Sequence, residues 1–118
     1  MLYAEWLYFE HSLRYEQLPD LLCALDLWTP ARGASAVEAR DARCAAVGLW
    51  TAPVVHRGPL RGMAELDALS ARSSAREGPM DGLILRQERA GALTDRCKWV
   101  RPDFRRIDDA AWARGRPK

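Results

Sequence analysis

A predicted β-hairpin in the C-terminal third most constrains how this chain can fold. Residues 81–86 and 95–101 are apolar runs with charged residues at intervals, and Gly91 lies in the short segment between them. This pattern is typical of two antiparallel strands joined by a tight turn. Residues i and i+2 of a strand share a face, so we expect Arg96 and Lys98 to point the same way. Two neighbouring cations repel each other unless an anion lies between them.

The counter-charge for this cation pair has more than one interpretation. Asp81, at the start of the first strand, can supply part of it, and a phosphate or a metal-bound phosphate can supply the rest. Alternatively, the hairpin is half exposed and its charges are solvated, since alternation of this kind is common in antiparallel sheets. Spacing alone therefore leaves ligand binding and a solvated surface open.

Two further carboxylates interrupt predicted strands. Glu5 lies in a strand expected over residues 2–9, and Asp26 lies in one expected over residues 20–28. A buried carboxylate without a partner is costly, so Glu5 needs solvent, a cation or a ligand hydroxyl. Asp26 either accepts hydrogen bonds, pairs with an arginine, or lies at a strand end near water.

The remaining elements predict an α+β fold with a mostly antiparallel sheet and two or three helices. A helix is expected over residues 36–47, where Ser35 and Glu38 would form a capping box and Gly48 would end it. A second helix is expected over 63–70 and a short strand over 53–56. On the first helix, Val37, Cys44 and Val47 are expected to face inward, and Arg40, Asp41 and Arg43 outward.

Composition indicates one small globular domain. The chain has 118 residues and a net charge of +2, which is too small to indicate nucleic-acid binding from bulk charge. Its three cysteines are widely spaced and without a ligand pattern, so we expect core thiols rather than disulfides or a zinc site. No apolar run approaches membrane-spanning length. We therefore expect a cytoplasmic location and no membrane partner. Residues 102–118 are expected to form a basic tail.

Three segments resemble motifs of the ATP-dependent RNA ligase family. Residues 77–86, with the order acidic residue, glycine, apolar run and arginine, are similar to the first of its last two nucleotidyltransferase motifs. Residues 96–104, with two basic residues separated by one, resemble its last motif. Residues 4–8, followed by 11–15 and 18–20, are similar to the middle motif, whose glutamate holds the ribose. The resemblance implies a partial adenylation domain of the covalent nucleotidyltransferase, ATP-grasp-like type.

The resemblance also implies a role for each matched residue. Arg96 and Lys98 would be catalytic and would hold the α-phosphate of ATP, Asp81 would hold Mg²⁺ or Mn²⁺, and Glu5 would bind the ribose. Asp81 stands where the family has glutamate. The strand over 20–28 would bring Leu25 and Asp26 to the nucleotide. Leu25 stands at the place of the family's adenine-stacking aromatic residue. We therefore expect ATP (as AMP) and a divalent metal as cofactors, and RNA ends as substrate.

The family's nucleophile motif, Lys-x-Asp-Gly, does not occur in the sequence. The only lysines are Lys98 and Lys118, and neither has that context. We therefore expect residues 1–118 to be the C-terminal part of an adenylation domain and to be inactive alone. Either the reading frame is truncated, or another polypeptide supplies the N-terminal half that carries the motif. The alternative is a non-catalytic remnant that binds a nucleotide, RNA or a protein. If the ligase interpretation is correct, Glu5, Asp81, Arg96 and Lys98 converge on one face.

Overall fold

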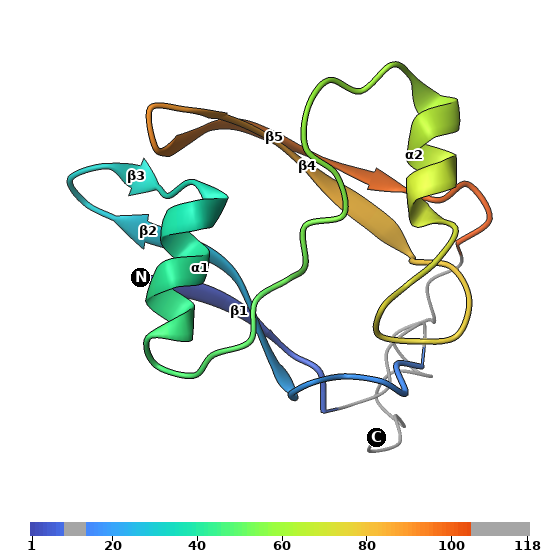
Figure 1. Ribbon diagram of the computed structural model, residues 1–118, viewed down its shortest axis with the longest axis horizontal. Coiled ribbons are helices and arrows are strands. Elements are labelled where there is room, and N and C mark those ends of the chain that lie inside the picture. The colour runs from blue at the N-terminus through green and yellow to red at the C-terminus, as the bar shows by residue number, and fades with distance from the viewer. Residues whose placement is uncertain (9–13, 105–118) are drawn as a thin grey trace, which may run out of the picture. The chain divides into compact units, whose positions relative to one another are not determined.

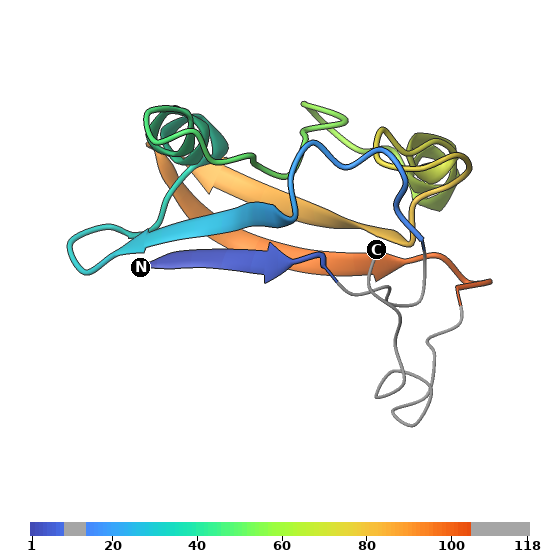
Figure 2. The same ribbon diagram turned by 90° about the horizontal axis from the view of Figure 1, so that it is seen from below.

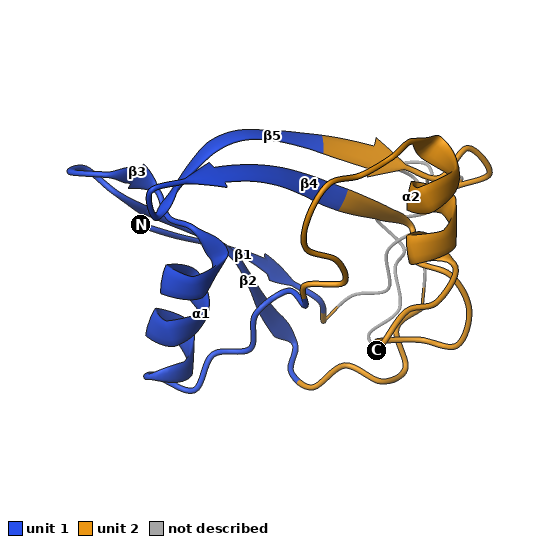
Figure 3. Ribbon diagram, turned by 45° about the horizontal axis from the view of Figure 1, so that its top comes forward, with its two compact units in different colours: residues 1–7, 20–53, 84–97 blue, residues 8–19, 54–83, 98–118 orange. Residues whose placement is uncertain are grey.

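The computed structural model describes residues 1–8 and 14–104, and the chain has the predicted α+β fold with antiparallel strand pairing (Figure 1). It divides into two compact units, which are coloured separately in Figure 3. Unit 1 comprises residues 1–7, 20–53 and 84–97, and unit 2 comprises residues 8–19, 54–83 and 98–118. Most of the predicted basic tail, residues 105–118, lies outside the described residues, as do residues 9–13, which include residues 11–13 of the middle motif. In order, the elements are β1 (Leu2–Trp6), β2 (Leu22–Thr29), β3 (Gly33–Ala34), α1 (Val37–Ala45), α2 (Met63–Ser70), β4 (Gly82–Arg89) and β5 (Ala92–Val100).

The sheet of unit 1 is built on β2, which pairs with β1 on one side and β3 on the other. β1 and β2 are antiparallel, with a bulge between Tyr3 and Ala4, and run side by side in Figure 2. β2 is the most buried strand because Cys23, Ala24 and Asp26 all turn away from water. Its apolar members explain the burial, and its one carboxylate requires a partner.

The predicted strand over residues 53–56 is wrong. Backbone pairing in this region lies just before it, because the Ala52 N–H donates to the Ala24 carbonyl at 3.0 Å and Thr51 forms an isolated parallel bridge to Ala24. Pro53 has no N–H with which to continue the ladder. Residues 53–56 are therefore in neither a strand nor a helix, despite the β-branched pair Val54 and Val55.

Helix α1 does not begin with the predicted capping box. Its N-cap residue is Ala36, and no side chain caps the helix from the N-cap position. Instead, the Val37 N–H donates to the carboxylate of Glu88 on β4, at 3.1 and 3.2 Å to the two oxygens. A distant carboxylate therefore replaces the local cap. The helix ends at Ala45, two residues before the predicted end, and Gly48, with φ of 72°, lies in the turn that follows.

The two faces of α1 are partly misassigned by the sequence pattern. Val37 and Cys44 are buried as predicted, whereas Val47 is 71% exposed and Arg40 is only 4% exposed. Arg40 lies on the buried face because it is three residues from Val37 and four from Cys44. Its guanidinium donates to the carbonyls of Leu25 at 2.9 Å and Ala52 at 3.0 Å, and these bonds allow the charge to be buried.

The hairpin formed by β4 and β5 is confirmed. Its turn consists of Ala90 and Gly91, with φ values of 50° and 78°, as in the type I′ turns that connect antiparallel strands. Near the other end of the hairpin, a Cβ placed on Gly82 would lie 2.3 Å from the Trp99 carbonyl oxygen. Glycine is therefore required at position 82 by a close backbone approach rather than by its φ.

Unit 2 contains α2, at the predicted residues 63–70, followed by an irregular segment that leads to β4. Among its described residues, Leu66, Ser70 and Trp99 are buried. The Met80 N–H donates to the Ser70 carbonyl at 2.9 Å, which ties the segment to the end of α2. Within the described residues of the chain, no helix has the length and apolar character needed to cross a membrane.

Candidate functional site

Asp26 is the centre of a charged cluster in unit 1. The Asp26 side chain is only 8% exposed and lies between two guanidinium groups. Its Oδ1 accepts a hydrogen bond from Nη1 of Arg86, and its Oδ2 accepts one from Nη1 of Arg96. Of the environments considered for Asp26, pairing with arginine is the one observed.

Arg86 belongs to the same cluster and is almost fully engaged. Besides Asp26, it donates from Nε to Glu88 at 2.8 Å and from Nη2 to the Ser35 carbonyl at 2.8 Å. Burial lowers the pKa of Arg86, but the hydrogen bonds and charges of Asp26 and Glu88 outweigh burial and raise that pKa above its ordinary value. Arg86 was not among the predicted site residues. The signal available was an Arg and a Glu two residues apart on one face of a strand, together with a lone Asp in another apolar strand.

Arg96 and Lys98 are both in β5, two residues apart, but they have different environments. The Arg96 side chain is 60% exposed, and its counter-charge is Asp26. Lys98 is exposed and forms no ion pair or hydrogen bond with the residues that the structure describes. Arg96 is therefore held at one end of its guanidinium, whereas Lys98 is free to turn.

The other predicted site residues lie on β1, on β2 and in the segment before β4. Glu5 is exposed on β1, where it pairs in register with Cys23. The pKa of the Cys23 thiol is raised from 9.0 to about 11, chiefly by burial and secondly by the negative charge of Glu5. Leu25 is half-buried on β2. In unit 2, Asp81 precedes β4, and its Oδ1 accepts a hydrogen bond from the Tyr15 hydroxyl at 3.3 Å.

Cys97 is exposed, so the expectation of three core thiols is wrong for this residue.

The predicted site residues are distributed over both units. Glu5, Asp26 and Arg96 belong to unit 1, and Asp81 and Lys98 belong to unit 2. Only Asp26 and Arg96 among these five are joined by a direct interaction within the described chain. Convergence of Glu5, Asp81, Arg96 and Lys98 therefore stays a prediction.

A metal at Asp81 would need ligands from its substrate. Among the described residues, no group of three or more His, Cys, Asp or Glu side chains is placed to hold a metal ion. Mg²⁺ is commonly bound by one or two carboxylates together with substrate phosphates and water, rather than by an all-protein cage. A single carboxylate at Asp81 fits that mode, and it does not fit a preformed metal site.

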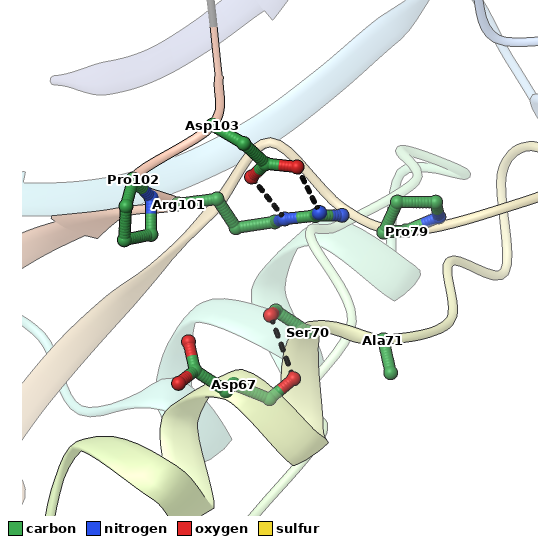
Figure 4. Close-up of a pocket in the computed structure, with 7 residues that line it drawn as sticks. All are labelled: Asp67, Ser70, Ala71, Pro79, Arg101, Pro102 and Asp103. Carbon is green, nitrogen blue, oxygen red and sulfur yellow. Dashed lines mark hydrogen bonds and ion pairs between the residues drawn. The ribbon is translucent and has the colours of Figure 1, made fainter.

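Unit 2 has a cavity of about 390 Å³, which Figure 4 shows with its lining residues. Arg101 in this cavity is bound to the carboxylate of Asp103 through Nε at 3.0 Å and Nη2 at 2.6 Å. The Ser70 hydroxyl donates to the Asp67 carbonyl at 3.0 Å. These groups satisfy one another, and none of the predicted site residues lines the cavity. We therefore place the candidate site at the Asp26 cluster.

In a comparison with known protein families, the RNA ligase family model matches residues 1–100. The matched region contains all the elements described above and every predicted site residue. Neither the comparison with curated proteins nor that with solved structures returned a match.

Proposed function

The chain belongs to the RNA ligase family, and we propose that it supplies nucleotide-binding groups to an ATP-dependent RNA ligase reaction. The observation that carries this proposal is the Asp26 cluster, which holds one end of the partly exposed Arg96 guanidinium. Arginine has five N–H donors, and Asp26 accepts from one of them. The remaining donors are available to a phosphate. A pre-positioned guanidinium stabilises charge that develops on a phosphoryl group more effectively than one that must be ordered on binding.

The proposed reaction consists of three phosphoryl-type transfers. A lysine Nζ attacks the α-phosphorus of ATP, and the bond to pyrophosphate breaks to leave a lysyl-AMP. A 5′-phosphate oxygen of RNA then attacks the AMP phosphorus and releases the lysine. Finally, a 3′-hydroxyl attacks the 5′-phosphate and releases AMP. Positioning and charge neutralisation account for most of the catalysis in such steps.

In these steps, Arg96 and Lys98 would neutralise the negative charge of the α-phosphate, which becomes the phosphate of AMP. Glu5 would accept hydrogen bonds from the ribose hydroxyls, and the strand segment at Leu25 would contact the adenine. Asp81 would bind Mg²⁺ or Mn²⁺, which supplies Lewis-acid stabilisation of phosphate charge when bound. Neither Lys98 nor Lys118 lies in a Lys-x-Asp-Gly context, so the nucleophilic lysine would come from outside residues 1–118.

ATP binding to the full chain tests this assignment. We expect Lys98→Ala to weaken binding of ATP in the presence of Mg²⁺ by roughly tenfold, because a charge-assisted contact to a phosphate is lost. Arg43→Ala, on the exposed face of α1, should leave ATP binding unchanged. Isothermal titration of both variants beside the wild type gives the comparison. Equal and small effects would mean that the β5 cations are solvated surface charges.

A further inference from the structure

A pocket lined by two arginines, Arg32 and Arg43, lies in unit 1. It has a volume of about 370 Å³, within the ~300–1,000 Å³ typical of ligand pockets. Its walls come from the end of β2, the turn before β3, the exposed face of α1 and the turn between β4 and β5. The lining residues are Leu27, Thr29, Ala31, Arg32, Ser35, Ala39, Arg43 and Gly91.

The charges of this pocket are uncompensated. Arg32 and Arg43 are both exposed, and neither forms an ion pair or a hydrogen bond through its side chain with any described residue. No carboxylate lines the pocket. The acidic residues of α1 that lie closest in sequence are Glu38 and Asp41, and Asp41 is bound to Arg40 at 2.8 Å. This differs from the Asp26 cluster, where each guanidinium has a carboxylate partner.

The other polar groups of the pocket suit a phosphate. Thr29 and Ser35 contribute hydroxyls that make no side-chain hydrogen bond to the described part of the chain. Hydroxyls and guanidinium groups are among the side-chain groups that bind phosphate oxygens of nucleic acids. Arg32 and Arg43 each offer a planar pair of donors that matches two phosphate oxygens.

The lining contains no aromatic side chain on which a base could stack. Single-strand recognition of bases relies on such stacking, whereas recognition of the backbone relies on cations and hydrogen-bond donors. We propose that the pocket around Arg32 and Arg43 binds a backbone phosphate of an RNA strand. The choice of RNA rests on the proposed function, and the phosphate chemistry rests on the pocket alone.

RNA binding by the full chain tests the proposal without ATP or metal. The probe is a fluorescent single-stranded RNA with 5′- and 3′-hydroxyl ends, so that only backbone phosphates are present. We expect the double variant Arg32→Ala/Arg43→Ala to bind it roughly tenfold more weakly than the wild type. The slope of log K against log salt concentration should fall in magnitude by about 0.7, the value for one lost phosphate contact on a single strand.

Arg72→Ala is the matched control, because Arg72 is also exposed and without a described side-chain partner but lies in unit 2. It should leave RNA affinity unchanged, and the double variant should leave ATP binding unchanged. Equal weakening of RNA binding by Arg72→Ala and by the double variant would overturn the proposal in favour of bulk charge. Unchanged RNA binding by the double variant would also overturn it.

A measurement on the wild-type chain is independent of how the variants fold. Phenylglyoxal modifies accessible arginines, and peptide mass spectrometry reports each site. We expect the RNA to protect Arg32 and Arg43 but not Arg72, whereas ATP should protect none of these three residues. Modification of Arg32 and Arg43 at the same rate with and without RNA would refute the proposal. Because no adenylation is measured, failure here is distinguishable from failure of the ATP site.

Discussion

Asp26 shows at the scale of one residue how a charge is accommodated in a strand that is otherwise apolar. Its carboxylate is buried, but it accepts hydrogen bonds from Arg86 and Arg96. Such an arrangement contributes little net stability compared with apolar packing, yet removing one member leaves an uncompensated buried charge. The cluster is therefore sensitive to single substitutions.

The first prediction concerns Asp26→Ala. We expect it to lower the free energy of unfolding by about 3 kcal/mol, the lower end of the range for a broken buried ion pair, because Arg86 keeps Glu88 as a partner. Urea unfolding followed by circular dichroism measures this difference. The control is Asp103→Ala, whose side chain is 69% exposed in its pair with Arg101 and should contribute less than about 1 kcal/mol. Similar losses for the two variants would contradict the buried cluster.

The second prediction concerns the cysteines. Cys97 is exposed, whereas Cys23 and Cys44 are buried, so iodoacetamide should label Cys97 first. Burial and the Glu5 charge raise the pKa of Cys23 to about 11, so its thiolate stays scarce in the folded chain at pH 9. Peptide mass spectrometry at several times of labelling resolves the three sites, and equal labelling in denaturant is the control.

The raised pKa of Cys23 also has a consequence for stability. A thiol whose folded pKa exceeds its unfolded value of 9.0 contributes stability below pH 9, and this contribution is lost as pH rises toward about 11. Replacement of Cys23 by Ala should therefore flatten the loss of stability between pH 9 and 11. Rapid labelling of Cys23 in the folded chain at pH 8 would contradict its burial.

At the scale of elements, α1 begins where a strand distant in sequence provides its cap. The Val37 N–H and the Glu88 carboxylate are 51 positions apart, and Glu88 also accepts from Arg86. The start of this helix therefore depends on the β4 and β5 hairpin rather than on the residues that precede it. Loss of the hairpin should shorten the helix as well.

The third prediction is that Glu88→Ala destabilises the chain by about 1–2 kcal/mol, as removal of a helix cap does. Glu88→Gln should lose less, because the amide oxygen still accepts from Val37. Thermal unfolding of both variants measures the difference, with Glu77→Ala as the control because Glu77 is exposed in unit 2. A full loss in Glu88→Gln would show that the charge, and not the hydrogen bond, is the important property.

The fourth prediction concerns the close approach of β4 and β5. Gly82→Ala should destabilise the hairpin by about 1–3 kcal/mol, since its Cβ would lie 2.3 Å from the Trp99 carbonyl oxygen and the strands must separate. Hydrogen exchange of β4 and β5 amides reports the local effect. Gly91→Asn is the control, because nothing lies within 4 Å of a Cβ there and asparagine tolerates its φ of 78°. Unchanged exchange in Gly82→Ala would contradict the close approach.

At the scale of the whole molecule, the residues proposed to bind the nucleotide are distributed between two units, each assembled from separate segments of the chain. Neither unit can be excised as one continuous piece. Any activity must therefore be measured on the full chain, and the full chain contains only the two lysines Lys98 and Lys118.

The fifth prediction follows from the context of these lysines. Incubation of the full chain with ATP and Mg²⁺ should give no covalent AMP adduct by intact mass, because neither lysine lies in a Lys-x-Asp-Gly sequence. Non-covalent ATP binding, measured in parallel, shows whether the nucleotide reaches the protein. An adduct located on Lys98 would overturn the proposal that the nucleophile comes from elsewhere.

The sequence by itself determined the features that depend on neighbouring residues. Alternation of side chains and the Gly91 turn predict the hairpin, and the spacing of apolar residues predicts α2. Motif order alone also indicated the RNA ligase family. These features are short-range, because turn geometry and side-chain period are set within a few residues.

Only the tertiary structure decided which partner each charged residue has. Asp26 and Arg96 are 70 positions apart, and Glu88 replaces Ser35 as the cap of α1. The burial of Arg40 also depends on residues outside its own helix, because the carbonyls of Leu25 and Ala52 accept its hydrogen bonds. The periodicity of a helix or strand predicts which way a side chain points from its own element. It cannot state what lies there, because the free energy of a buried charge depends on acceptors and donors that distant segments bring to it.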